Sequence, residues 1–444
     1  MLGPNRIREI CNFLLKASQP AHAEVWIEFF DEALTRFANN AIHQNVNERN
    51  ASVTLRLSLD GRLGTASTNR LDSEALNLLA QDALAHACCT PVDPNDPGLP
   101  DPQSIQPAQA FDEVVAVCSP NQRAAPVKEV CAKAAEAGLN AAGAFSTTAI
   151  EMAYANSAGA FAYHPCTCAE FQTTVMGADA SGRGQGAAWR LEDLNVADLG
   201  AEAIATARTG RAPRLLAPGE YPVILLPYAV LDLVSNLSAH GVNGLSLLEG
   251  RSWMIGRQGQ PAASPQISLW DDGRDERGIP LPFDGEGQPR RRVDIIRQGQ
   301  VLDAVYDRAT AKKAGRTTTG HALPPAERSM GAMACNLFMA PGSTGYGDLL
   351  KSVPNGLLIT RFWYTRLVKA RDCVMTGMTR DGVFWVENGE VQYPVRNLRF
   401  TQSYILALAD VAAVGDRDPL LKAQYGQIFA RVPALAIQRF RFTS

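Results

Sequence analysis

Alternating strands that are joined by tight turns constrain the fold of this chain most. Apolar residues alternate through residues 51–59 with the period of two expected of a half-buried strand, and Asp60-Gly61 follows as a hairpin turn. The same dipeptide chemistry predicts turns at Asp381-Gly382 and Asn388-Gly389, which would make residues 373–395 a meander. Strands joined in this way pair antiparallel with their neighbours, so the sequence predicts antiparallel sheets.

Helical periodicity and capping residues predict helices between these strands. The predicted helices cover residues 4–17, 72–89, 120–138, 197–210 and 402–414. The other predicted strands cover residues 24–30, 33–38, 41–47, 62–68, 141–155, 160–178, 266–271, 292–296, 301–306, 356–362, 373–378, 382–387 and 390–395. The proline density of residues 90–107 predicts an extended loop.

The order of these elements predicts an α+β fold of two domains. At 444 residues the chain is too long for one ordinary core, and a proline-bearing joint lies near residues 211–220. We expect an N-terminal α/β domain over residues 1–212, with antiparallel strand meanders and flanking helices, and a C-terminal β-rich domain over residues 213–444. Asn/Gly turn motifs recur in the first half, which indicates either two related meanders or chance.

Composition argues against several classes of protein. The formal net charge is −3 and no dense Lys/Arg run occurs, which argues against a nucleic-acid-binding protein. No apolar run approaches the roughly 18 residues that a membrane span needs, and the N-terminus has the pattern of a helix rather than a signal peptide. The nine cysteines form no regular framework, so we expect a reducing, cytoplasmic setting.

Residues 221–256 contain the stretch with the clearest chemical interest. A short apolar run bounded by prolines predicts a buried strand, and Pro227 begins a helical pattern that reaches His240 and stops at Gly241. A strand that leads into a helix ending in a lone histidine is a common setting for a catalytic metal. The stretch therefore raises the question whether such a metal site is intact here.

Several longer segments resemble the TldD/PmbA family. They are FANNAIHQN, WDDG, GIPLPFDGEGQPRRRVDIIRQGQVLDAVYDRATAKKAG, GLLITRFWYTR and MTGMTRDGVFWVENGEVQYPVRNLRFTQS, in the family's order, and the resemblance runs from about residue 20 to 444. The resemblance implies an N-terminal α/β domain, a largely β C-terminal domain and membership of a zinc metallopeptidase system. In that system a TldD-like subunit carries the metal and pairs with a TldE-like subunit, also called PmbA.

The resemblance also implies that the metal motif, HExxxH, is degenerate in this chain. Aligned without gaps from Gly250 and Ser252, the motif's second histidine falls on His240, its first on Ser235 and its glutamate on Asn236. A hydrolytic zinc needs about three protein ligands, and asparagine has no useful pKa for a general base. We therefore expect no catalytic residue, no cofactor-binding residue and no metal in this chain, with zinc in a TldD-like partner. His240 would be a vestigial capping or packing residue; the alternative is a metal ligand completed from elsewhere.

Other candidate sites are weaker. The HPCTC segment at 164–168 has ligand-type residues, but ordinary strand packing explains it equally well. Asp271-Asp272 and residues 284–286 gather carboxylates, for which turn chemistry is the alternative to a cation site. The GRGQG segment at 182–186, interpreted as a turn, lacks the lysine of a phosphate loop, and His321 is interpreted as a solvated turn residue.

Residues 360–366 form the most unusual polar and aromatic run. Arg361, Trp363, Tyr364 and Arg366 are candidate peptide or partner contacts, because interleaved arginines and aromatic residues suit a peptide groove or an inter-subunit surface. Strand alternation would place Arg361, Trp363 and Thr365 on one face and Phe362, Tyr364 and Arg366 on the other. The alternative is a buried face with an arginine paired to a carboxylate of the same domain.

These observations favour a non-catalytic TldE/PmbA-like subunit of a zinc metallopeptidase complex that degrades or trims unfolded or leader peptides. Its expected partners are a TldD-like zinc-bearing subunit, in a heterodimer, and peptide substrates, with no nucleic acid and no membrane; a homodimer stays open. The alternatives are a stand-alone metallopeptidase or hydrolase with unidentified ligands, and a binding module that acts on gyrase or DNA.

Overall fold

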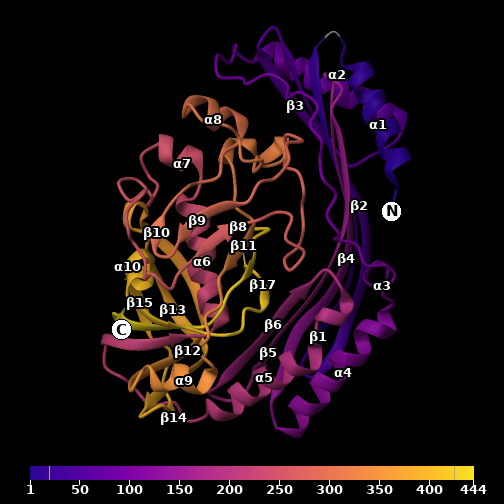
Figure 1. The fold of residues 1–444 in the computed structure, drawn as a ribbon. Helices are drawn as coiled ribbons and strands as arrows, with labels where there is room; N and C mark the ends of the chain where they lie inside the picture. The colour runs from indigo at the N-terminus through magenta and orange to yellow at the C-terminus, as the bar shows by residue number, and fades with distance from the viewer. Residues whose placement is uncertain (20, 425) are drawn as a thin grey trace.

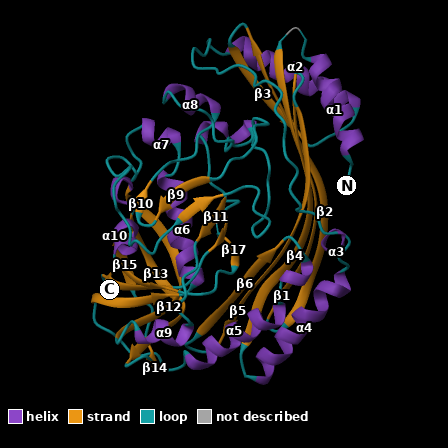
Figure 2. Ribbon diagram, in the orientation of Figure 1, coloured by secondary structure: helices purple, strands orange, loops and turns teal. Residues whose placement is uncertain are grey.

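The chain forms a long curved sheet that wraps around a second body built from two further sheets (Figure 1). The computed structural model describes residues 1–19, 21–424 and 426–444. Figure 2 shows the helices of the first half along the outer side of the curved sheet and strands dominating the second half. The predicted α+β class is confirmed, whereas the domain boundary at 212/213 stays a proposal.

The curved sheet has six antiparallel strands in the order β3-β2-β1-β4-β5-β6. Its strands are β1 (His22–Ala38), β2 (Ala41–Leu59), β3 (Arg62–Thr68), β4 (Asn140–Asn156), β5 (Phe161–Met176) and β6 (Ser181–Ala188). Its helices are α1 (Pro4–Ala17), α2 (Ser73–Cys89), α3 (Glu113–Ala116), α4 (Pro120–Glu136) and α5 (Val196–Thr209). The order helix, three strands, helix occurs twice, and a separate apolar core lies under each helical layer.

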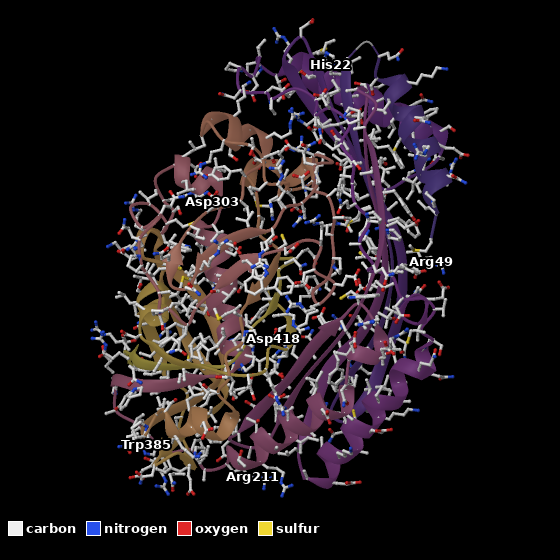
Figure 3. The ribbon with its side chains drawn as sticks, in the orientation of Figure 1. His22, Arg49, Arg211, Asp303, Trp385 and Asp418 are labelled. Atoms are coloured by element: carbon white, nitrogen blue, oxygen red, sulfur yellow. The ribbon has the colours of Figure 1, made fainter. Side chains whose placement is uncertain are left out.

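Two breaks predicted in the first hairpin are wrong. The predicted strands 24–30 and 33–38 form the single strand β1, and 41–47 and 51–59 form the single strand β2. Asp31 lies directly opposite Arg49 (labelled in Figure 3), with 2.6 Å between Oδ2 and Nε. Charged residues are therefore accommodated within the ladder as a cross-strand pair instead of interrupting it.

The second half consists of two sheets around a central helix. Its strands are β7 (Gly219–Leu225), β8 (Leu269–Asp271), β9 (Val293–Arg297), β10 (Gln300–Val301), β11 (Asn336–Met339), β12 (Asn355–Lys369), β13 (Val374–Glu387), β14 (Glu390–Pro394), β15 (Arg399–Ser403), β16 (Val411–Val414), β17 (Leu420–Lys422), β18 (Phe429–Arg431) and β19 (Leu435–Phe442). Its helices are α6 (Pro227–Gly241), α7 (Gly244–Leu248), α8 (Arg308–Lys313), α9 (Tyr346–Lys351) and α10 (Tyr404–Ala409). Short 3₁₀ turns cover Leu191–Asp193, Pro325–Met330 and Ala370–Asp372.

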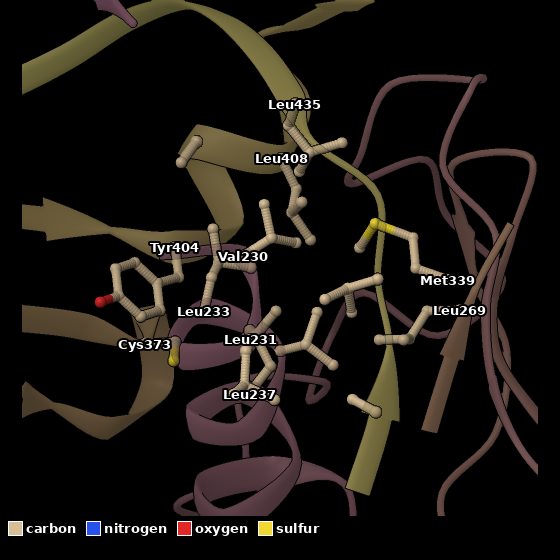
Figure 4. Packing of buried hydrophobic residues seen from close by; sticks show 14 of the residues in the cluster. Val230, Leu231, Leu233, Leu237, Leu269, Met339, Cys373, Tyr404, Leu408 and Leu435 are labelled. Atoms are coloured by element: carbon tan, nitrogen blue, oxygen red, sulfur yellow. The ribbon is translucent and has the colours of Figure 1, made fainter. Parts of the chain in front are cut away.

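Helix α6 packs at the centre of the largest core. Its residues Val230, Leu233 and Leu237 lie among side chains of both sheets, including Leu269 and Leu435 (Figure 4). The helix begins at Pro227, whose missing N–H costs nothing at a first helical position, as the sequence predicts. Apolar residues on nearly every side bury the helix and fix the direction of its remaining polar face.

Three predictions for the second half are wrong. Asp381-Gly382 makes no hairpin: β13 runs through it, and the two residues form a bulge opposite Thr360 of β12. The predicted helix 402–414 ends at Ala409, because residues 411–414 pair with β19 as strand β16. Of the predicted strand 301–306, only Val301 lies in a strand, as the second residue of β10. The hairpin turn at Asn388-Gly389, by contrast, is confirmed.

Buried charges join the two halves. The guanidinium of Arg328, on a 3₁₀ turn of the second half, donates to the buried Glu24 of β1. Arg56 of β2 donates to the same carboxylate at 2.7 Å. No helix within residues 1–19, 21–424 and 426–444 has both the length and the apolar character needed to cross a bilayer.

Candidate functional site

A cavity of 1130 Å³ lies between the curved sheet and the second half of the chain. One wall consists of residues from β1, β4, β5 and β6, and the other of residues from α6 and β12, Arg380, and residues 422–424 and 426–428. Figure 1 shows α6 and β17 facing the inner side of the sheet. All of the degenerate motif and all of the 360–366 run except Thr360 line this cavity, so the structure brings the two predicted regions together.

The motif positions on α6 hold side chains that bond to their own helix. Ser235 Oγ donates to the carbonyl oxygen of Leu231 at 2.7 Å, and Asn236 Nδ2 donates to the carbonyl oxygen of Asp232 at 2.8 Å. Burial, and next the nearby Arg251, lower the pKa of the partly buried His240. The helix therefore presents a hydroxyl, an amide and a neutral imidazole to the cavity at neutral pH.

This donor set does not fit a hydrolytic zinc. Such a zinc takes about three nitrogen, sulfur or carboxylate ligands, and serine and asparagine are poor substitutes. Asp232, the carboxylate nearest in the helix, lies eight residues before His240, which is about 12 Å along an α-helix. Among the described residues, no group of three or more His, Cys, Asp or Glu side chains is arranged to hold a metal ion.

Asp232 itself has a structural role that the sequence did not indicate. Its carboxylate accepts hydrogen bonds from Tyr404 Oη at 2.6 Å and from Thr365 Oγ1 at 2.7 Å. Burial raises the pKa of this carboxyl group. Asp232 thus ties the cavity face of α6 to β12 and α10.

The run 361–366 is shaped by two bulges in β12 and β13. Arg361 Nε donates to the buried Asp381, whose left-handed backbone (φ 56°) belongs to the bulge that replaces the expected hairpin. Two guanidinium groups lie over the Trp363 ring, that of Arg361 at 4.9 Å and that of Arg380 at 5.3 Å from its centroid. The pairing of Arg361 with Asp381 also agrees with the alternative prediction, an arginine bound to a carboxylate of the same domain.

The strict alternation predicted for this run is wrong at Tyr364. Its backbone is left-handed (φ 53°), and the β12–β13 register shifts between Trp363 and Arg366. Tyr364 is 62% exposed, whereas Phe362, predicted on the same face, is buried. The guanidinium of Arg366 stacks on the Tyr364 ring at 4.2 Å.

Strand β6 corrects the interpretation of GRGQG as a turn. A Cβ at Gly182 or Gly184 would lie 2.1 Å from a backbone oxygen of α5, so these glycines allow the helix to rest on the strand. The side chains between them, Arg183 and Gln185, line the cavity. The alternation of glycine with polar residues is the sequence signal that could have placed Arg183 on one face of a strand. The glycine-rich composition favoured a turn instead, so the strand was missed.

The remaining candidate ligands serve packing and turns. His164 is buried with Nε2 3.0 Å from the Pro280 oxygen, and burial raises the pKa of both Cys166 and Cys168, the latter to about 12. Thiols held protonated in this way are poor metal ligands. The HPCTC segment therefore has the chemistry of ordinary strand packing.

The acidic segments also have structural partners. The Asp284 carboxylate accepts hydrogen bonds from the backbone N–H groups of Glu286, Gln288 and Ala322 at 2.8–2.9 Å. These bonds stabilise the turn in which Asp284 lies. The prediction of a solvated His321 is wrong, because the ring is fully buried with Nε2 2.8 Å from Asp271 Oδ1.

Comparison with known proteins agrees with this architecture. Residues 23–87, 102–211 and 218–444 match PmbA/TldA metallopeptidase domain 1, the central domain and the C-terminal domain, respectively. The metalloprotease PmbA of Escherichia coli O157:H7 is 25% identical over 377 residues, which are 80% of this chain and 78% of that protein. The metalloprotease PmbA homolog of Haemophilus influenzae is 28% identical over 208 residues, which are 46% of this chain and 43% of that protein.

The fold matches a solved structure along its whole length. The crystal structure of TldE from Thermococcus kodakarensis superposes with a TM-score of 0.90 at 18% identity, covering 99% of this chain and 100% of that one. Fold and cavity thus define a metallopeptidase-related α+β protein. The chain belongs to the PmbA/TldD family. The resemblance that the sequence motifs indicate is confirmed.

Proposed function

We propose that this chain is a non-catalytic TldE/PmbA-like subunit of a zinc metallopeptidase complex that degrades or trims unfolded or leader peptides. A TldD-like subunit would supply the zinc, and this chain would supply binding surface. The observation that carries the proposal is the pair Ser235 and Asn236 on the cavity face of α6, where a metallopeptidase of this kind needs a histidine and a glutamate.

The cavity supports a role in holding peptide. Its volume of 1130 Å³ exceeds that of a typical small-molecule pocket, and polar and aromatic side chains are interleaved on its wall. Arg361, Trp363, Tyr364 and Arg366 remain the proposed peptide or partner contacts. A half-buried Trp363 in contact with two guanidinium groups has the composition of a recognition surface.

Assembly and location complete the proposal. The solved relative from T. kodakarensis is a TldE, which favours a heterodimer with a TldD-like chain. All nine cysteines are free thiols, which favours the cytoplasm. A homodimer would use the same kind of surface and is distinguished by the measured mass of the assembly.

Reconstitution tests this function. The purified chain alone should not cleave unfolded peptides, and its zinc content should be far below one ion per chain and unchanged in His240→Ala. Mixed with a TldD-like chain from the same organism, it should give a peptidase that a chelator inactivates. Cleavage by the isolated chain that both a chelator and His240→Ala abolish would overturn the proposal in favour of a stand-alone metallopeptidase.

A further inference from the structure

Strand β6 directs an arginine into the cavity. Because α5 rests directly on Gly182 and Gly184, side chains of any size at these positions are excluded from that face. The residue between them, Arg183, lies on the opposite face and lines the cavity with Gln185. The backbone contact with α5 therefore determines where this guanidinium points.

Neutral oxygens hold the guanidinium in place. Arg183 Nη2 donates to Gln172 Oε1 at 2.6 Å and to Gln185 Oε1 at 3.0 Å, and Nη1 donates to Thr174 Oγ1 at 3.3 Å. Its Nε has no hydrogen-bond partner among the residues that the structure describes. No described carboxylate lies within ion-pair distance of this guanidinium, so its charge is oriented but has no direct ion-pair partner among the described residues.

The nearby carboxylates are already engaged. Asp381 accepts from Arg361 and from Ser181 Oγ at 2.6 Å, and Glu170 pairs with Lys422 at 3.0 Å. These partners leave Arg183 without a counter-charge of its own.

The cavity as a whole carries an excess of basic groups. Among the described residues that line it, six are lysine or arginine and three are aspartate or glutamate. The six basic residues are Arg36, Arg183, Arg361, Arg366, Arg380 and Lys422. A cavity with low-dielectric walls and an excess of one charge concentrates ligands of the opposite charge.

We propose that Arg183 binds a carboxylate of the peptide in this cavity, so that the chain favours peptides that place a carboxylate there. The inference rests on the proposed function and specifies its substrate class. The Arg183 guanidinium is already held at both Nη atoms and its buried Nε has no partner among the described residues, so it loses little side-chain freedom on binding a carboxylate. Charge-assisted bonds of this kind are among the stronger ones in proteins. The carboxylate belongs either to Asp and Glu side chains or to the peptide's C-terminus.

Peptide binding to the isolated full-length chain tests this inference without zinc or a partner. We would measure fluorescence anisotropy with three unstructured peptides that carry an uncharged dye: a Glu-containing peptide with blocked ends, its Gln counterpart, and the Gln peptide with a free C-terminal carboxylate. At low salt the Glu peptide or the free-carboxylate peptide should bind about tenfold more tightly than the blocked Gln peptide. Which of the two is preferred identifies the source of the carboxylate.

Variants assign the preference to one residue. Arg183→Gln should abolish the preference, Arg183→Lys should retain part of it, and Arg439→Gln, an exposed arginine paired with Asp410, should leave it unchanged. Rising ionic strength should weaken the preference in the unmodified chain, a measurement that needs no variant.

Equal affinities for all three peptides, absence of binding, or a preference that survives in Arg183→Gln would each overturn the inference. None of these results would affect the reconstituted peptidase. Conversely, a zinc-dependent activity of the isolated chain would overturn the proposed function and leave the charge preference standing.

Discussion

Asp381 carries the buried charge that holds Arg361 against the cavity wall. The Asp381 side chain is 1% exposed and that of Arg361 is 13% exposed. The carboxylate also accepts from Ser181 Oγ of β6, so it links the two halves of the chain. Asp381→Asn keeps the size of the side chain and tolerates the left-handed backbone of the bulge, but it removes the charge.

The magnitude follows from the charge that is left behind. Removing one partner of a buried ion pair costs about 3–5 kcal/mol, because the other charge stays desolvated and uncompensated. Arg361 faces the cavity and keeps some exposure, so we expect a loss near the lower bound, about 3 kcal/mol. If the proposed C-terminal domain, residues 213–444, unfolds as one cooperative unit, a loss of about 3 kcal/mol lowers its Tm by about 6–12 °C.

Thermal melts of matched variants measure this loss. Asp381→Asn is compared with the double variant that adds Arg361→Gln, which should recover more than half of the lost Tm because no charge is then left unpaired. Arg439→Gln breaks the exposed pair with Asp410 and should leave Tm unchanged, since exposed ion pairs contribute little.

Two results would refute the reasoning. A Tm for Asp381→Asn within about 2 °C of the parent would mean that water already screens the pair. A double variant no more stable than Asp381→Asn would mean that lost shape in the bulge, and not an unpaired guanidinium, causes the destabilisation.

Two further predictions concern packing and pH. Gly184→Ala should lower the free energy of unfolding by about 2 kcal/mol or more, because the new Cβ would lie 2.1 Å from the Leu199 oxygen. Gly347→Ala, which has open space at its Cβ, is the control and should not lower it. Thermal melts of the two variants test this, and equal Tm values would contradict the close contact at Gly184. Burial, with neighbouring carboxylates, raises the pKa of Glu286 to about 7. The protonated side chain therefore stabilises the fold fully below the unfolded-state pKa of 4.5, and this stabilisation is lost as the pH rises through about 7. The loss amounts to about 3 kcal/mol in total. Glu286→Gln should therefore flatten the decline in Tm between about pH 5 and about pH 8, and an unchanged decline would contradict it.

Local chemistry made much of the fold predictable. Helix α2 begins after Asp72, whose side chain accepts a hydrogen bond from the Ala75 N–H, and α6 begins at Pro227. The turn at Asp60-Gly61 needs two left-handed residues in succession, and the sequence supplies residues that adopt this conformation readily. In each case the decisive contacts lie within a few residues of the signal.

Long-range contacts account for what could not be predicted. Asp381-Gly382 has the same composition as a hairpin turn, but its carboxylate binds Arg361, twenty residues away, and Ser181, two hundred residues away. The glycines of β6 signal a turn until α5 is seen to rest on them. No local pattern contains these partners, so no local pattern could distinguish a bulge or a covered strand from a turn.

The candidate site divides along the same line. Ser235, Asn236 and His240 could be located through their spacing on one helix, whereas the facing wall of the cavity comes from strands fifty or more residues away. That wall determines what the site can do. Three polar groups on α6 cannot activate water without further ligands, but the same three groups close a cavity whose opposite side presents an oriented, uncompensated guanidinium. An oriented charge that meets no reactive group can hold a peptide without cleaving it. Under the proposed function, selecting the peptide and cleaving its backbone are separate tasks, and this chain would perform the first of them.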